Sequence, residues 1–326
     1  MLKTRFTELV GCSVPIQQAG LGALATPRLA AAVANAGGLG MVSIAGLSPE
    51  EIAKDLDDTR NQTSGPIGAN IVLPFLDAAT ARESVKASAP KANVIEFFYS
   101  DPDASLIELA HAGGALAAWQ VGSREEAVAA QEAGCDFIVA QGIEAGGHVR
   151  GHIGLLPLLS EVMESVRVPV LAAGGIGSGR AMAAVLAAGA DGVRVGTRFV
   201  AAEEAEAHPD YVNALIAAEA KDSVYTDIFS VGWPDAPHRV LQSSIEAVQA
   251  FEGDIIGRRY WPEEDEWEEL HRFESKTANK HMIGAVEAMP LWAGQSVGGV
   301  KKVQPAAEIV RELAEQAEQL LRRWYE

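Results

Sequence analysis

The chain repeats one local pattern eight times, and this repeat constrains its fold more than any other feature. Each unit has a short apolar run and then a stretch with helical spacing that is rich in Ala, Leu, Glu and Arg. Eight alternating units predict a closed parallel (β/α)8 barrel, which typically needs about 250 residues. An open doubly wound sheet is the alternative architecture. The expected strands are 14–19, 39–43, 66–72, 94–98, 116–121, 136–141, 169–174 and 192–196.

Capping residues support the helices expected between these strands. Hydroxyl side chains precede several helical segments, and glycines follow several, where a left-handed backbone ends a helix. The caps are Thr26, Ser48, Ser123 and Ser178 at the starts and Gly37, Gly113, Gly134 and Gly189 at the ends. The expected helices are 27–36, 49–58, 77–88, 103–112, 123–133, 155–165 and 178–188.

The last third of the chain has a different character. After about residue 205 the strand rhythm stops, and tryptophans appear together with an acidic stretch at 261–274, which is expected to be a solvated face. A final amphipathic helix is expected at roughly 305–324, with Ile309, Leu313, Leu320 and Leu321 toward a core. We therefore expect a barrel at 1–204, an accessory helical lobe at 205–290, and a C-terminal loop and helix at 291–326 that return to the barrel.

Composition limits the partners. A net charge of −18 and a pI near 4.8 argue against nucleic acid and anionic membranes, so a small molecule is the expected partner. Two cysteines without a CxxC motif exclude an iron–sulfur cluster or a cysteine zinc site held by this chain alone. The sequence has neither a signal-peptide core nor a run of roughly 20 apolar residues, and a cytoplasmic enzyme is expected.

The sixth strand ends in the sequence QGIEAGGHVRG at 141–151, where a barrel of this kind carries its chemistry. Gly146 and Gly147 remove side chains that would keep a flat ligand off the backbone, and His148 can then reach that ligand. A purely structural hydrogen bond from His148 is one alternative. A metal pair with His152 is another, but the surrounding glycines make a helix there improbable and no third ligand is evident, so no metal is expected.

The seventh and eighth strands end in glycine-rich loops, AAGGIGSG at 172–179 and RVGTRF at 194–199. Loops at these two positions often bind a phosphate through backbone N–H groups. Tight turns alone are the simpler interpretation of each loop, but two such loops together favour a phosphate site. A competing GxGxxA pattern at Gly20, Gly22 and Ala25 could indicate a dinucleotide fold, yet the acidic residue expected about 20 positions later is missing.

Taken together, these motifs resemble the FMN-dependent nitronate monooxygenases, formerly called 2-nitropropane dioxygenases. The resemblance runs from about residue 15 to 199 and again over 290–313. The segments that carry it are PIQQAGLGALATPRLAAAVANAGGLG at 15–40, GANIVLPF at 68–75, QGIEAGGH at 141–148, LAAGGIGSG at 171–179, VGTRF at 195–199 and PLWAGQSVGGVKKVQPAAEIVREL at 290–313.

The resemblance implies FMN as cofactor, His148 as the catalytic residue, and oxidation of alkyl nitronates of the propionate 3-nitronate type with O2 to a carbonyl compound and nitrite or nitrate. It places Ala19, Gly20 and Gly146 at the flavin ring and Asn70 and Gln141 at flavin or ribityl polar atoms. It places Gly174, Gly175, Gly196 and Thr197 at the phosphate.

Two departures from the family pattern affect these expectations. Gly20 replaces a proline of many relatives, and Gln120 stands where some relatives place a lysine near the flavin, so this neutral amide would stabilise the reduced flavin less. The same motifs also resemble NAD(P)H:quinone reductases and FMN-dependent enoyl-acyl-carrier-protein reductases, in which NAD(P)H reduces the flavin. A non-redox barrel that binds a phosphate ligand is the alternative from another class.

Overall fold

Eight parallel strands form the centre of the computed structural model, which describes residues 2–262 and 265–323. The strands follow the order β1-β9-β8-β6-β5-β4-β3-β2, and a parallel bridge between Gln17 and Leu39 joins the two ends of this sheet. The (β/α)8 barrel is thereby confirmed. Its strands are β1 (Ile16–Gln18), β2 (Gly40–Ser43), β3 (Ile67–Val72), β4 (Val94–Phe98), β5 (Leu116–Val121), β6 (Phe137–Gln141), β8 (Val170–Ala173) and β9 (Gly192–Val195).

The helices that cover the barrel begin and end close to the expected positions. Ser48, Ser123 and Ser178 each accept a backbone hydrogen bond in the first turn, whereas Thr26 makes no side-chain cap. The seven helices between strands are α2 (Pro27–Asn35), α3 (Pro49–Arg60), α4 (Ala78–Ser88), α5 (Ala104–Ala112), α6 (Arg124–Glu132), α7 (Leu155–Ser165) and α8 (Gly179–Ala187). Shorter pieces are η1 (Gly22–Leu24), η2 (Leu73–Phe75) and α9 (Thr197–Val200).

One expected cap is wrong by a single residue. Gly113 has a right-handed helical φ of −80°, and the following Gly114 takes the left-handed φ of +91°. A Cβ on Gly113 would lie 2.4 Å from the Cβ of Ala89, so this glycine is needed for the close packing of α5 on the end of α4. Gly113 thus permits close packing and Gly114 provides the left-handed turn. A sequence pattern does not show which of two adjacent glycines has which role.

A short helix that the sequence analysis did not predict, α1 (Arg5–Val10), closes the amino-terminal end of the barrel. Phe6 is fully buried and meets Phe137 of β6 edge to face, with 5.3 Å between ring centroids. Arg5 forms an ion pair with Asp191 before β9. Six residues are too few for a recognisable helical period, so no sequence pattern predicts this helix.

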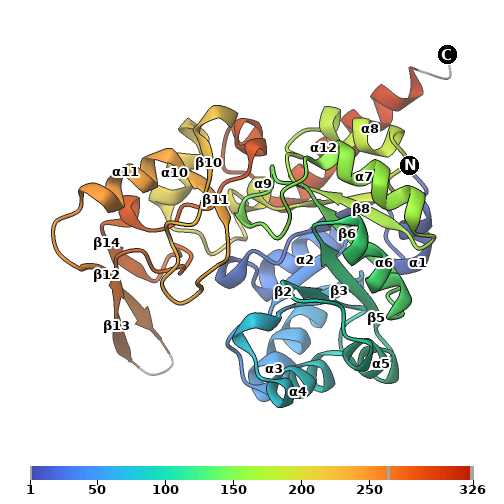
Figure 1. Cartoon of the computed structure of the whole chain (residues 1–326), viewed down its shortest axis with the longest axis horizontal. Coiled ribbons are helices and arrows are strands. Elements are labelled where there is room, and N and C mark those ends of the chain that lie inside the picture. The colour runs from blue at the N-terminus through green and yellow to red at the C-terminus, as the bar shows by residue number, and fades with distance from the viewer. Residues whose placement is uncertain (1, 263–264, 324–326) are drawn as a thin grey trace.

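The expectation of a helical accessory lobe is wrong, because the lobe contains both helices and strands. In Figure 1 it lies beside the barrel in yellow to orange, and a two-stranded arm formed by β12 and β13 projects from it. Within the expected acidic face, Glu263 and Glu264 lie outside the described residues. The elements are α10 (Pro209–Ala217), η3 (Ala220–Asp222), β10 (Ser223–Thr226), β11 (His238–Leu241), α11 (Gln242–Ala250), β12 (Ile255–Trp261), β13 (Glu266–His271), β14 (Met282–Gly284) and η4 (Val286–Ala288).

Cross-strand pairs explain why the charged stretch is a hairpin. Arg259 lies opposite Glu268, and Tyr260 lies opposite Trp267, with 5.2 Å between the two ring centroids. Such opposite-charge and aromatic pairs stabilise antiparallel strands. Trp267 remains half exposed, so the arm is also a solvated surface.

The chain then returns to the barrel through η5 (Gln295–Gly299) and α12 (Ala306–Arg322). This last helix, red in Figure 1, packs against α8 and α2. Ile309 and Leu313 are buried and Leu320 and Leu321 are partly buried in the barrel core, as expected. We propose the division into 1–204, 205–290 and 291–326 as the domain organisation. Among the described residues no helix is long and apolar enough to cross a membrane.

The packing of α12 predicts the effect of Leu313→Ala. Leu313 is 1% exposed, so its truncation leaves a cavity and should lower the free energy of unfolding by about 2–5 kcal/mol. Urea unfolding measures this loss. Gln319→Ala, on the exposed side of the same helix, is the control and should change stability by less than about 0.5 kcal/mol. Equal effects of the two substitutions would contradict the packing.

Candidate active site

A cavity lies where the carboxyl ends of the barrel strands meet the lobe, and it brings together every site residue expected from the sequence. Glycines from four strand ends form part of its wall, and aromatic rings from the lobe form another part. The contacts of these residues with a cofactor stay predictions. The expected residues that line the cavity are Ala19, Gly20, Asn70, Gln120, Gln141, Gly146, His148, Gly174, Gly175, Gly196 and Thr197.

The protein itself requires two of these glycines. A Cβ on Gly146 would lie 2.3 Å from the backbone nitrogen of Gly294, and one on Gly20 would lie 2.4 Å from Oδ1 of Asn70. Gly146 therefore permits the segment after the lobe to pass close to the loop of His148. The structure assigns this glycine to backbone packing, in addition to the flat-ligand contact that we expected.

His148 is held by a short antiparallel pairing between barrel and lobe. Gly147 and His148 form the two-residue strand β7 (Gly147–His148), in register with Arg239 and His238 of β11. The amide of Gln141 supports the loop from the other side, because its Nε2 donates to the carbonyl of His148 at 3.0 Å and its Oε1 accepts from the backbone N–H of Arg150 at 3.2 Å. Both polar atoms of Gln141 thus already bind the protein, and its contact with a cofactor stays a prediction.

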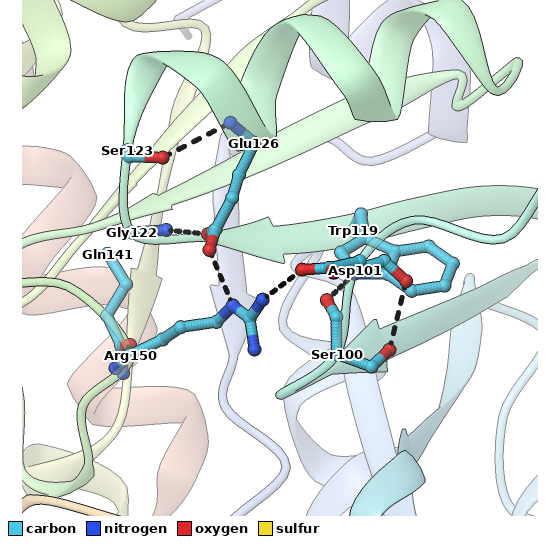
Figure 2. A network of polar contacts seen from close by, with 8 residues as sticks. All are labelled: Ser100, Asp101, Trp119, Gly122, Ser123, Glu126, Gln141 and Arg150. Carbon is cyan, nitrogen blue, oxygen red and sulfur yellow. Dashed lines mark hydrogen bonds and ion pairs between the residues drawn. The ribbon is translucent and has the colours of Figure 1, made fainter.

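Arg150 ties the same loop to the ends of two further strands. Figure 2 shows its guanidinium between Glu126 of α6 and Asp101 after β4, at 2.7 Å and 2.6 Å. The second carboxylate oxygen of Glu126 accepts from the backbone N–H of Gly122 after β5. Three consecutive strand ends are therefore joined around one side chain, which keeps the segment behind His148 in place.

Aromatic rings enclose the imidazole. Trp233 stacks on His148 with 3.8 Å between centroids and 29° between planes, and Trp292 lies 5.1 Å away. Both tryptophans line the cavity, while Tyr260 and Trp261 lie on the projecting strand β12. Sequence reasoning missed Phe75 and Phe98 of the cavity wall, because both sit in apolar runs that resemble ordinary core.

The electrostatic environment keeps His148 neutral. Burial, and to a smaller extent the neighbouring His238, lowers the pKa of His148 to about 3. The Nε2 atom is buried and has no hydrogen-bond partner in the protein. His238 differs, because its two ring nitrogens are engaged with Ala236 and Phe229. Nε2 of His148 is thus a buried polar atom that the protein leaves without a partner, on a residue that lines the cavity.

Two charged residues of the site were not anticipated as such. Arg194 of β9 lines the cavity, and Nη2 of this residue lies 2.7 Å from Oε1 of the fully buried Glu96 of β4. Sequence reasoning placed Arg194 only within a phosphate loop and Glu96 only within an apolar run. The alternation of Arg194 with Val193 and Val195, which pack in the outer core, could have marked an inward-facing polar residue.

The close approach at Gly146 predicts that Gly146→Ala destabilises the protein without any ligand. The added Cβ meets backbone atoms of Ala293 and Gly294, which cannot move independently, and the cost should be about 1–3 kcal/mol. Denaturant unfolding of ligand-free protein provides the measurement. Gly196→Ala is the matched control, since its Cβ would have only ordinary contacts at 3.5 Å with Ala19 and Leu21. A stable Gly146→Ala variant would refute the packing argument.

The lowered pKa of His148 predicts a pH-dependent stability. Between pH values of about 6.5 and 3 the unfolded chain binds a proton at this residue and the folded chain does not, so stability falls as the pH falls. The difference in unfolding free energy between wild type and His148→Gln should therefore drop by about 1.4 kcal/mol per pH unit in this window. His238 is present in both proteins, so its contribution to the pH dependence largely cancels in this difference. A difference that is constant with pH would contradict a neutral buried His148.

Comparisons with known proteins agree with this geometry. A family model described as nitronate monooxygenase matches residues 3–316. A probable nitronate monooxygenase of Staphylococcus aureus is 29% identical, with 98% of each chain covered. Among solved structures, FabK from Thermotoga maritima superposes with a TM-score of 0.80 at 28% identity, over 100% of this chain and 99% of that one. A nitroalkane oxidase from Streptomyces ansochromogenes superposes with a TM-score of 0.76 at 27% identity, over 99% and 100%. The chain belongs to the nitronate monooxygenase family and is a flavin-dependent oxidoreductase.

Proposed function

We propose that the cavity binds FMN and that the enzyme oxidises alkyl nitronates with O2 to a carbonyl compound and nitrite or nitrate. The residues present fit this cofactor. Trp292 and Ala145 give an apolar wall, as a planar ring requires, and the amide of Gln120 offers a donor and an acceptor that are both buried without a partner. A buried amide left unpaired costs free energy, which a bound polar ring edge would recover.

The phosphate of FMN has a matching place at the ends of β8 and β9. Gly174 and Gly175 have φ values of +106° and +69°, and such a turn directs successive backbone N–H groups toward one point. Oγ1 of Thr197 accepts from the N–H of Gly294, so its own proton is free to be donated. We infer that these groups, with Ser296 nearby in the cavity wall, hold the phosphate without a basic side chain.

When bound, FMN supplies the electron acceptor for the substrate carbon and the site of reaction with O2. The side chains of this chain have the remaining tasks. Trp233 stacks on His148 and fixes the plane of the imidazole, while Phe75 and Phe98 add apolar surface to the cavity wall. A neutral imidazole that carries its proton on Nε2 donates one hydrogen bond to a nitro oxygen and thereby orients the substrate.

The buried, unpartnered Nε2 of His148 is the observation that carries this proposal. A general base works best when its pKa lies near the operating pH, and a pKa of about 3 makes His148 a poor base for removing a proton from a neutral nitroalkane. A nitronate needs no such step, because it enters as a carbanion equivalent. The unpartnered Nε2 then serves as a hydrogen-bond partner, and the nitronate is the preferred substrate form.

A nicotinamide-dependent reductase is the second candidate, and the likeness to FabK supports it. A dinucleotide brings a pyrophosphate in addition to the phosphate of FMN. Among the described residues that line the cavity, Arg194 is the only lysine or arginine, and Glu96 already neutralises it. This scarcity of cations favours the nitronate as the reducing substrate.

The proposal predicts a yellow protein that releases FMN on denaturation, whereas a non-redox phosphate barrel would be colourless. Anaerobic mixing with propionate 3-nitronate should bleach the flavin absorbance, and NADH should bleach it far more slowly. His148→Gln should keep FMN and lose about 10²–10⁴-fold of the rate with nitronate, the range of a single acid–base or positioning group.

His152→Gln is the matched control for that variant. His152 lies in the same loop, is exposed and does not line the cavity, so its replacement should leave the bleaching rate unchanged. Rapid bleaching by NADH alone would replace the proposal with the reductase. Unchanged kinetics of His148→Gln would remove this histidine from the mechanism.

A further inference from the structure

A buried ion pair spans the inside of the barrel beneath the cavity. Glu96 has no exposed surface, and three side chains from three other strands donate to its carboxylate. Oε1 accepts from Asn70 at 2.8 Å and from Arg194 at 2.7 Å, and Oε2 accepts from Gln17 at 2.6 Å. Both oxygens of this carboxylate therefore accept hydrogen bonds, and the bond from Arg194 is charge-assisted.

Stability does not explain this pair. Moving two charges out of water costs several kcal/mol, and well-packed apolar residues of similar size are often as good or better. The layer below is apolar, with Met41, Val94, Phe137 and Leu171 filling the same barrel. A charged layer between this core and the cavity therefore calls for a function directed at the cavity.

The polar atoms that remain unpaired point to a ligand. Nε of Arg194 is buried without a partner, as are both amide atoms of Gln120, and both residues line the cavity. In the part of the lining that the structure describes, Arg194 is the only residue with a permanently charged side chain. A charge that develops on a bound ligand would meet this cation before any other.

The side chain of Arg194 points away from the proposed phosphate-binding loops. β9 and β4 stand opposite one another in the strand order of the barrel, and the guanidinium reaches across to Glu96 on β4. It therefore extends across the barrel and away from β9, the strand that leads to the loop of Gly196. Asn70, its neighbour on Glu96, also lines the cavity on that side.

We propose that Arg194 is a cofactor-binding residue that lies against the flavin ring, and that Glu96 limits its effective charge and so sets the reduction potential. This inference rests on the proposed binding of FMN. Two-electron reduction with uptake of one proton leaves one negative charge on the ring, which a nearby cation stabilises. Gln120, which lines the same cavity, is neutral, so the balance between Arg194 and Glu96 decides how strongly that charge is stabilised.

The pair predicts shifts of opposite sign in the midpoint potential of bound FMN. Arg194→Met removes the cation and should weaken binding of reduced relative to oxidised flavin by about tenfold, which is about 30 mV lower for a two-electron couple. Glu96→Gln removes the counter-charge and should raise the potential. Arg194→Lys should keep a midpoint potential near that of the wild type. If Arg194→Met does not fold, Arg194→Lys and Glu96→Gln together still test the inference. Dye-equilibrated reductive titration of the flavin-loaded proteins measures all of them.

Arg198→Met is the matched control. Arg198 is also buried and ion-paired, with Glu312, but does not line the cavity, so its loss should leave the potential unchanged. If Arg194→Met weakens FMN binding without shifting the potential, the residue serves the phosphate or ribityl chain and the inference fails. Shifts of the same sign for Arg194→Met and Glu96→Gln would also overturn it. A wild-type protein that binds no FMN would instead overturn the proposed function.

Discussion

The antiparallel pairing of β7 with β11 is the interaction on which the site depends. It has only two residue pairs, extended by a hydrogen bond from Val149 N–H to the carbonyl of Pro237 at 2.8 Å. These backbone bonds fix the position of His148 relative to the lobe that supplies Trp233 and to the adjoining segment that supplies Trp292. The lobe is thus part of the active site itself. Without it the imidazole would lose the burial that lowers its pKa and would titrate like an exposed histidine.

The side chains of His148 and Glu96 lie in opposite kinds of environment. His148 is buried among aromatic rings with its Nε2 unpaired, so the neutral form is favoured. Glu96 is buried and accepts hydrogen bonds from three side chains, one of which, Arg194, balances its charge. The cavity therefore carries little net charge although the chain as a whole has a net charge of −18. A small anionic substrate can enter such a space without a fixed carboxylate in the described cavity wall to repel it.

The barrel could be predicted from sequence because its signals are local. Each strand is a short apolar run bounded by a turn, and serine caps such as Ser48 and Ser178 mark where helices begin. The lobe could not be predicted in this way. Its strands β12 and β13 carry charges on both faces, so the alternation that identifies a half-buried strand is missing. The pairing of β7 with β11 and the bond of Glu96 to Arg194 join distant segments, which no local pattern reports.

The glycines show how structure refines a motif. Sequence reasoning assigned the whole set to a ligand, yet Gly20 and Gly146 are required by neighbouring protein atoms, and Gly174 and Gly175 by their positive φ. Gly196 has neither cause, because its φ is −111° and a Cβ would meet only ordinary contacts. Its missing side chain leaves the backbone open toward the cavity. Among these five glycines, Gly196 is therefore the one that no contact within the protein requires. A phosphate bound against its backbone would account for it.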